Sequence, residues 1–468
     1  MKSKPTIGVL TLTMLNLAIV CTLRGLPIMA EEGLSLVFYF VVVALIFFIP
    51  LSLICAELAT GWPPRGPGGI YVWVDEAFGP KWGFLAIWLQ WVQNFVWFPT
   101  ILSFIAATLA YIYDPSLASN RYYMVAIVLI AYWGGTLVNF LGMEASGILS
   151  LVCVVLGTII PGILIIGLGA AWLYAGEVSA ISFSYGDILP DFSDIRNIVF
   201  LAGAMLMFAG MEVSAAHSQD VKNPKRTYPR SILLSAAIAL ALLMLGSLSI
   251  AIVVPQKEIS LVAGVMETFS SFFHVHGFGW AIPLLAVFIA AGAVGELSAW
   301  IVGPAKGLLV TAKHGHLPPF LQKTNSRNVP TNILLVQGAV ATAVTFVFLY
   351  MPTVSSSYWI LSALTILLYL LMYLLLFATA IKLRYSRPDV VRAYTVPGGK
   401  PVMWIVAGLG IAGSLFTFFV SFFPPAQIVT GSIVFYELFL IIGTVLSCLV
   451  PFIIFRFQKP EWRRAETD

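Results

Sequence analysis

Two carboxylates that stand alone in long apolar stretches are the residues of this chain best suited to do chemistry. Glu212 is the only formal charge between Arg196 and Asp220, and Glu296 lies in a similarly apolar segment. An acid inside a membrane-length apolar stretch is costly and usually functional. Each carboxylate could bind a substrate cation, carry or sense a proton, or simply hydrogen-bond the end of a broken helix.

A cation, Arg24, lies in the first apolar stretch and is followed by Gly25 and Pro27. Glycine tolerates strained backbone and proline removes a helical donor, so the pattern favours a break in a membrane helix at Gly25. The alternative is a plain helix end whose arginine reaches the membrane surface. A second break is expected at Gly210, just after Phe208. Broken backbone at membrane depth is tolerated where it lines a cavity, so both breaks predict a binding site.

Tyr369 and Tyr373 are spaced i, i+4 near the middle of a later apolar stretch, which places them on one helix face. The spacing fits either core packing or contact with a substrate. His314 and His316 lack a further ligand at suitable spacing, and the four cysteines form no CxxC pair. We therefore expect no metal and no cofactor. No nucleophile, base and ligand group converge in the sequence, which argues against a membrane-embedded enzyme.

The composition assigns these residues to a membrane. The chain has 468 residues, of which 60% are hydrophobic and 10% charged, with a mean hydropathy of +0.95. Soluble domains carry about 25% charged residues, so an ordinary soluble protein is excluded. Repeated apolar runs of about 20 residues predict an all-α polytopic membrane protein embedded in a lipid bilayer. A net charge of +4 is too small to suggest nucleic-acid binding.

Twelve membrane-spanning helices are expected in a single membrane transport domain, residues 1–468. The predicted spans are 7–30, 34–59, 81–112, 122–142, 146–175, 196–219, 231–254, 279–311, 331–350, 356–382, 402–423 and 433–456. Most of the 25 lysines and arginines fall on one side of this arrangement. The excess of positive charge predicts a multi-pass protein of the inner (plasma) membrane with both termini in the cytoplasm.

The two expected breaks lie in spans one and six, which are five spans apart. An odd offset means that two five-helix halves run in opposite directions, the pattern of an inverted repeat. The first repeat would cover residues 7–175 and the second 196–382, followed by helices eleven and twelve at 402–456 and a short cytoplasmic tail at 457–468. The first break would offer N–H groups to a carboxylate, and carbonyls of residues 207–210 would accept from an ammonium group. Arg24 could bind a second carboxylate.

Several motifs resemble those of the amino acid–polyamine–organocation transporter superfamily and, within it, the glutamate:γ-aminobutyrate antiporter family. They are LRGLP (23–27), GMEVSAAH (210–217), NPKRTYP (223–229), SIAIVVP (249–255), ELSAWIVGP (296–304), VSFFPP (420–425) and the pair Tyr369 and Tyr373. The resemblance implies that superfamily's five-plus-five fold with helices 1 and 6 broken, plus two extra helices, and exchange by alternating access. It also implies that Arg24, Glu212, Glu296, Tyr369 and Tyr373 line the central path.

The chain departs from the family pattern in two places. The family's acid-resistance antiporter closes its inner mouth with a long C-terminal plug, whereas only about a dozen residues follow span twelve here, so we expect no such plug. Cys21 and Gly25 stand where the family has Tyr and Asn beside the arginine. The resemblance therefore implies a roomier site and leaves the exchange pair open.

We expect a secondary active amino acid antiporter whose partners are a small-molecule amino acid, the bilayer and, if the carboxylates titrate, protons. A proton-coupled amino acid symporter is the alternative within transport, and sodium coupling through the Ser298 hydroxyl is a weaker one. A transport-deficient amino acid sensor also fits the sequence. The oligomeric state is not indicated.

Overall fold

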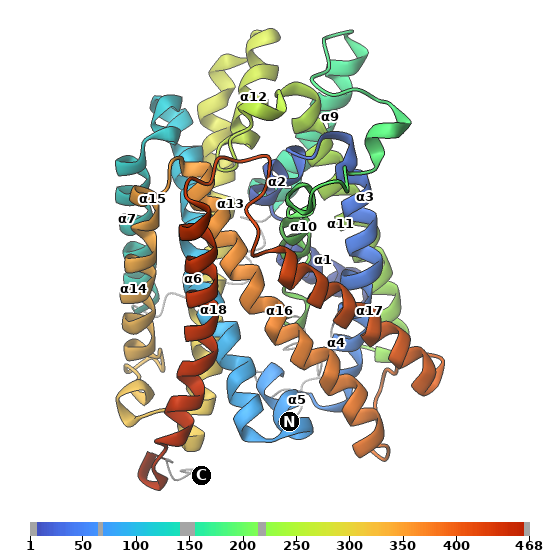
Figure 1. Cartoon of the computed structure of the whole chain (residues 1–468), viewed down its shortest axis with the longest axis vertical. Coiled ribbons are helices and arrows are strands. Elements are labelled where there is room, and N and C mark those ends of the chain that lie inside the picture. Colours follow the sequence, from blue (N-terminus) through green and yellow to red (C-terminus); the bar gives the residue numbers. More distant parts are fainter. Residues whose placement is uncertain (1–6, 64–68, 141–154, 214–220, 463–468) are drawn as a thin grey trace.

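The computed structural model describes residues 7–63, 69–140, 155–213 and 221–462, which form an all-α bundle without a β-strand (Figure 1). The longest helices run between two ends of the molecule. In chain order they are α1 (Val9–Val20), α2 (Leu26–Ala30), α3 (Leu36–Val43), α4 (Ile49–Gly61), α5 (Gly69–Phe78), α6 (Pro80–Tyr113), α7 (Arg121–Phe140), α9 (Ile160–Tyr174), α10 (Leu201–Met207), α11 (Pro224–Val253), α12 (Gly264–Val275), α13 (Ile282–Thr311), α14 (Thr331–Thr345), α15 (Val347–Tyr350), α16 (Val354–Ser386), α17 (Gly399–Val420) and α18 (Ile433–Arg456).

Eleven helical stretches in the described part of the chain are long and apolar enough to cross a membrane. They coincide with predicted spans two to twelve, which confirms a polytopic all-α membrane protein. The first predicted span, 7–30, is divided into α1 and α2, and neither piece is long enough alone. Parts of the predicted fourth, fifth and sixth spans, 141–142, 146–154 and 214–219, lie outside the described residues.

Helix α6 forms the centre of the bundle and contacts α7, α13, α14, α16 and α18. Nearly all of its side chains from Gly83 to Tyr111 are buried. A helix that is apolar on all sides must be surrounded by protein or lipid. The polar exceptions, Gln90, Gln93 and Asn94, are buried near its middle, so the neighbouring helices must supply their partners.

Two short helices mark the opposite ends of the bundle (Figure 1). Helix α5 buries an apolar face that includes Trp73 and Val74; it lies in the connection 61–80, for which the sequence predicted an ordered turn rather than a span. Residues 64–68 of that connection are outside the described part. Helix α12, which the sequence did not predict, lies between α11 and α13 at the other end. These are called the α5 end and the α12 end below.

The segments at the α5 end of α1 and before α11 are joined through their backbones. Ile7 and Val221 form an isolated parallel bridge, and the Lys222 N–H donates to the Ile7 carbonyl at 2.9 Å. Asn223, with a φ of 44°, then turns the chain into α11. The N-terminal segment is thereby attached to the chain that follows α10.

Candidate functional site

The first break lies at Cys21 and Thr22, not at Gly25 as the sequence predicted. Helix α1 ends at Val20, and Cys21 and Thr22 are extended before a 3-10 turn, Leu23–Gly25, leads into α2. Gly25 itself has helical dihedral angles. Its glycine is needed for packing, because a Cβ there would lie 2.7 Å from Cγ of Met207. Gly25 therefore allows α10 to approach the first broken helix closely.

The second break occurs at Gly210, as predicted. Helix α10 ends at Met207, and Gly210 has a φ of +109°. Residues other than glycine rarely adopt this backbone conformation. A Cβ at Gly210 would also lie 2.8 Å from Cγ2 of Ile19. The backbone N–H of Gly210 donates to the Tyr373 hydroxyl at 2.7 Å. Residues 214–220, which include the end of the GMEVSAAH motif, are outside the described part.

Glu212 follows this break and is only 4% exposed. Its Oε2 accepts from the Tyr373 hydroxyl at 2.9 Å, and its Oε1 accepts from Gln90 Nε2 at 3.2 Å. Among the described residues, no ion pair includes Glu212. The carboxylate is thus held by neutral donors from α16 and α6. Tyr373 connects the two elements, because its hydroxyl donates to Glu212 and accepts from Gly210.

A cavity of about 30 Å³ lies between the two breaks and brings together three of the predicted site residues, Arg24, Glu296 and Tyr369. Gln93 and Asn94 of α6 also line it. These two amides and Gln90 are not among the site residues predicted from the sequence. The three amides lie close together in an apolar helix of membrane-spanning length, and this clustering could have indicated a site. Without knowledge of the neighbouring helices, however, it cannot be told from amides that only take part in packing.

Arg24 is buried at 6% exposure, and its guanidinium lies 4.9 Å from the centre of the Trp97 ring. Its Nη1 donates to the Tyr358 hydroxyl at 3.4 Å, and that hydroxyl donates to the Arg24 carbonyl at 3.0 Å. No carboxylate pairs with Arg24 in the described part of the chain, and its Nε has no hydrogen-bond partner there. The guanidinium is therefore held in place while at least one of its N–H groups, on Nε, remains available to a ligand.

Glu296 of α13 lines the same cavity, close to Thr22 and within the electrostatic influence of Arg24. The two side chains do not form an ion pair within 4.0 Å among the described contacts. The cavity wall therefore has a guanidinium and a carboxyl group that do not pair with each other directly.

The two tyrosines of α16 are stacked, with ring centres 5.3 Å apart. Tyr369 lines the cavity, whereas Tyr373 is fully buried against Phe47 and reaches Glu212. Phe208 does not line the cavity; its ring packs against Phe40 and Phe48. Of the predicted site residues, Phe208 and Gly25 thus contribute packing and backbone rather than a surface for a ligand.

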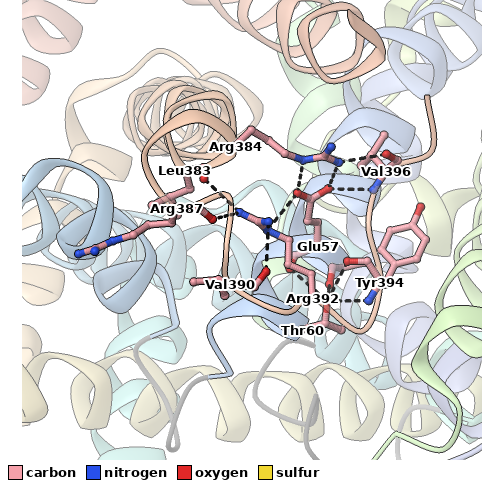
Figure 2. Close-up of polar contacts among 10 residues, drawn as sticks. Glu57, Thr60, Leu383, Arg384, Arg387, Val390, Arg392, Tyr394 and Val396 are labelled. Carbon is pink, nitrogen blue, oxygen red and sulfur yellow. Dashed lines mark hydrogen bonds and ion pairs between the residues drawn. The ribbon is translucent and has the colours of Figure 1, made fainter. Parts of the chain in front are cut away.

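A second buried carboxylate, Glu57, lies near the α5 end and is bound by cations (Figure 2). Arg384 of α16 donates to both of its oxygens at 2.5 Å, and the Val396 N–H donates to Oε2 at 2.8 Å. Arg392 Nε lies 3.5 Å from Oε1. The connection between α16 and α17 is further attached to α4 because Thr60 exchanges two hydrogen bonds with the backbone of Tyr394. The sequence analysis did not single out Glu57.

Three carboxylates gather at the α12 end, outside the predicted spans. Burial, and then the charges of Glu32 and Glu267, raise the pKa of Glu31 to about 8. Burial also raises the pKa of Glu267 to about 7, although a hydrogen bond from the Ser260 N–H opposes this. Glu32 Oε1 accepts from Gln427 Nε2 at 2.8 Å. No cation pairs with these groups among the described residues.

The histidines that the sequence analysis rejected as ligands lie at the α5 end. His316 is buried, and its Nε2 lies 3.1 Å from the Tyr71 hydroxyl, while His314 is exposed. The described residues contain no group of three His, Cys, Asp or Glu side chains that could hold a metal. Nothing in this arrangement suggests a ligand-binding role for the two histidines.

The chain is similar over almost its whole length to known proteins. Residues 7–446 match the model of a family described as amino acid permease. The chain is 43% identical, over 96% of its length and 97% of the relative, to an uncharacterized transporter of Legionella pneumophila. It is 36% identical, over 95% of its length and 89% of the relative, to a glutamate/gamma-aminobutyrate antiporter of Lactococcus lactis strain IL1403, and equally to that of strain MG1363.

Proposed function

The chain belongs to the amino acid permease family, and we propose that it is a secondary active amino acid antiporter that works by alternating access. Membership confirms the resemblance inferred from the motifs and agrees with a transporter rather than an enzyme. Its substrate is a small-molecule amino acid and its surroundings are the lipid bilayer. The geometry of the central cavity supports the same function independently.

The observation that carries the proposal is the presence of Arg24 and Glu296 on the wall of one cavity without a direct ion pair. A zwitterion would neutralise both groups at once. Its carboxylate would accept two parallel hydrogen bonds from the guanidinium, the geometry that arginine provides. Its ammonium group would be attracted by Glu296. Trp97 and Tyr358 hold the guanidinium in position before the substrate arrives.

We propose an exchange of the glutamate and γ-aminobutyrate type, because a relative that spans almost the whole chain carries that name. Both compounds combine a carboxylate with an ammonium group, which fits the two charges of the cavity. At about 30 Å³, the cavity holds about two water molecules in this conformation, so it must widen to admit either compound. Cys21 and Gly25, where the family has larger side chains, do not line the cavity, so we expect them to affect the preference only through the packing around it.

In the proposed cycle, the contacts of Tyr373 with Gly210 and Glu212 close the cavity toward the α5 end and break when substrate leaves. We propose that one helix bundle then rocks against the remaining scaffold, within a five-plus-five inverted repeat. We further propose that the protein lies in the inner membrane with the α5 end and both termini in the cytoplasm. Most lysines and arginines lie on that side in the predicted topology, which supports this orientation.

Counterflow in proteoliposomes tests the proposal. Vesicles containing the purified protein are loaded with glutamate, γ-aminobutyrate or buffer, and uptake of labelled glutamate is followed. We expect fast uptake only into loaded vesicles, and loss of uptake in Arg24→Ala and Glu296→Gln. His314→Ala, which changes an exposed side chain away from the cavity, serves as the control. Equal rates in all three variants would refute the proposed site.

A proton-coupled amino acid symporter is a second candidate, and the neutral surroundings of Glu212 favour it. A buried carboxylate without a neighbouring cation is suited to take up a proton. Symport predicts uptake into empty vesicles that an imposed pH gradient drives and a protonophore abolishes. Such uptake would replace the antiporter proposal, whereas uptake that requires internal amino acid would eliminate the symporter.

A further inference from the structure

A second, smaller cavity lies next to the central one, farther along both broken helices. The central cavity is lined by Ile19 and Ala209, whereas the second is lined by Asn16, one turn earlier on α1, and by Met211, two residues later. The remaining walls come from α4 and α11. The second cavity therefore continues the path from the central site beyond the break at Gly210, between α1, α4 and α11.

Three polar atoms in this cavity have no hydrogen-bond partner in the described part of the chain. They are the side-chain oxygens Oδ1 of Asn16, Oγ of Ser52 and Oη of Tyr228, which come from α1, α4 and α11. The three residues are only 2%, 2% and 4% exposed. Buried polar atoms almost always have a partner in a folded protein. Three such atoms around one cavity indicate a ligand that connects them.

The size and chemistry of the cavity select water as that ligand. Its volume is about 10 Å³, enough for the centre of one water molecule. An amide oxygen only accepts hydrogen bonds, whereas the hydroxyls of Ser52 and Tyr228 both donate and accept. One water molecule could donate to Asn16 and to one hydroxyl while it accepts from the other. No Asp or Glu side chain lines the cavity, and hard cations favour sites rich in carboxylates.

The contact between α1 and α11 beside this cavity is formed by polar side chains over more than one helical turn. Asn16 Nδ2 donates to Ser235 Oγ at 3.2 Å and lies 3.4 Å from Ser231 Oγ, and Thr13 donates to Ser231 at 3.3 Å. Polar groups that separate can be hydrated, so a polar contact opens at less cost than an apolar contact of the same area. This face of α1 is suited to leave α11 when water enters.

We propose that this cavity binds one water molecule, hydrogen-bonded to Asn16, Ser52 and Tyr228, and that α1 separates from α4 and α11 along this hydrated contact during transport. The water site stands on the cavity and its three polar atoms. The separation of α1 rests on the proposed transport function.

Radiolytic footprinting tests the water site on the intact protein. Hydroxyl radicals formed from bound water modify nearby Tyr and Met side chains, which mass spectrometry detects. We expect Tyr228 and Met211 to be modified several-fold faster than Tyr436 and Met403, which are equally buried but do not line the cavity. Equal, slow modification of all four residues in the wild-type protein would show a dry cavity and overturn the proposal.

A pair of matched variants localises the signal. Ser52→Ala removes a proposed water ligand and should reduce the modification of Tyr228. Ser247→Ala removes a buried, unpartnered hydroxyl of α11 that does not line the cavity, and should leave Tyr228 unchanged. Stabilisation by sodium chloride over choline chloride that Ser52→Ala abolishes would instead assign a sodium site and overturn the assignment to water.

Transport measurements test the second part separately. Ser52→Val fills the cavity and should slow counterflow several-fold, while stabilisation by amino acid substrate stays at the wild-type level. Wild-type counterflow in Ser52→Val would overturn the role of the hydrated contact in opening. Footprinting requires no transport, so fast modification of Tyr228 in a protein without counterflow would refute the antiporter and leave the water site standing.

Discussion

Glu212 and Glu57 are buried to the same degree but are bound in opposite ways. Glu57 is surrounded by two guanidinium groups and a backbone N–H, so its charge is balanced within the protein. Among the described contacts, the side chains that donate to Glu212 are neutral, a tyrosine hydroxyl and an amide. A balanced charge fixes a structure, whereas an unbalanced one is available to a proton or to a substrate cation. The neighbours of each acid, rather than its burial, separate the two roles.

Removal of Glu57 should have the largest effect on stability. Glu57→Ala leaves Arg384 and Arg392 buried without their counter-charge, which should cost about 3–5 kcal/mol. Thermal unfolding of the purified protein in detergent measures the loss. Glu76→Ala is the matched control, since the Arg387–Glu76 pair is largely exposed and worth about 0–1 kcal/mol. Equal melting temperatures of the two variants would contradict a structural role for Glu57.

Glu212→Gln should give the reverse pattern, with an unchanged fold and impaired transport. The amide keeps the shape of the side chain but removes its charge. A hydrogen bond to a charged group contributes about 1.5–3 kcal/mol, which corresponds to a decrease of about ten- to a hundredfold in counterflow. The amide can still bond to Tyr373 or Gln90, so we expect a smaller loss of stability than in Glu57→Ala. Counterflow at the wild-type rate would remove the distinction between the two acids.

Tyr373→Phe tests whether the hydroxyl connects Glu212 to the break at Gly210. It should lower stability by about 1–3 kcal/mol, because buried groups lose their partners. Tyr369→Phe is the control, since Tyr369 shares the helix face but not the bond to Glu212. In a double-mutant cycle, Glu212→Gln and Tyr373→Phe should not be additive. Additive effects would mean that the observed hydrogen bond contributes nothing.

The buried carboxylates at the α12 end should make the stability of the protein depend on pH, and this is the smallest of the expected effects. Their pKa values are raised in the folded protein, to about 8 for Glu31 and about 7 for Glu267, so between about pH 4.5 and pH 8 the unfolded chain has released protons that the folded protein retains. Stability should therefore decrease as pH rises through this range. Glu31→Gln should flatten a plot of melting temperature against pH. An unchanged slope would show that Glu31 does not titrate there.

The sequence was most informative where a local rule decides the structure. Eleven apolar stretches gave the spans, and Gly210 marked a break because its positive φ requires glycine. Gly25 misled because its small size serves a contact with Met207, more than 180 positions away in the chain, rather than its own backbone. A glycine looks the same in both cases, so sequence alone could not place the first break at Cys21 and Thr22.

The site was predicted in part for the same reason. Arg24, Glu212 and Glu296 stood out as isolated charges; the structure places Arg24 and Glu296 on the wall of one cavity and buries Glu212 after the break at Gly210. Glu57 did not stand out because it lies near the end of a span, and its partner Arg384 is 327 residues away. Gln90 was missed because its role depends on a hydrogen bond to Glu212, which is distant in the sequence. The sequence does not show which side chains from distant segments contact each other.

The bridge between Ile7 and Val221 has a mechanical consequence for the first broken helix. This helix is held at its α5 end by the backbone pairing with the segment that leads into α11, and at the level of the cavity by the close contact of Gly25 with Met207. Separation of α1 from α11 therefore requires the bridge to open, or residues 221–223 to move together with α1.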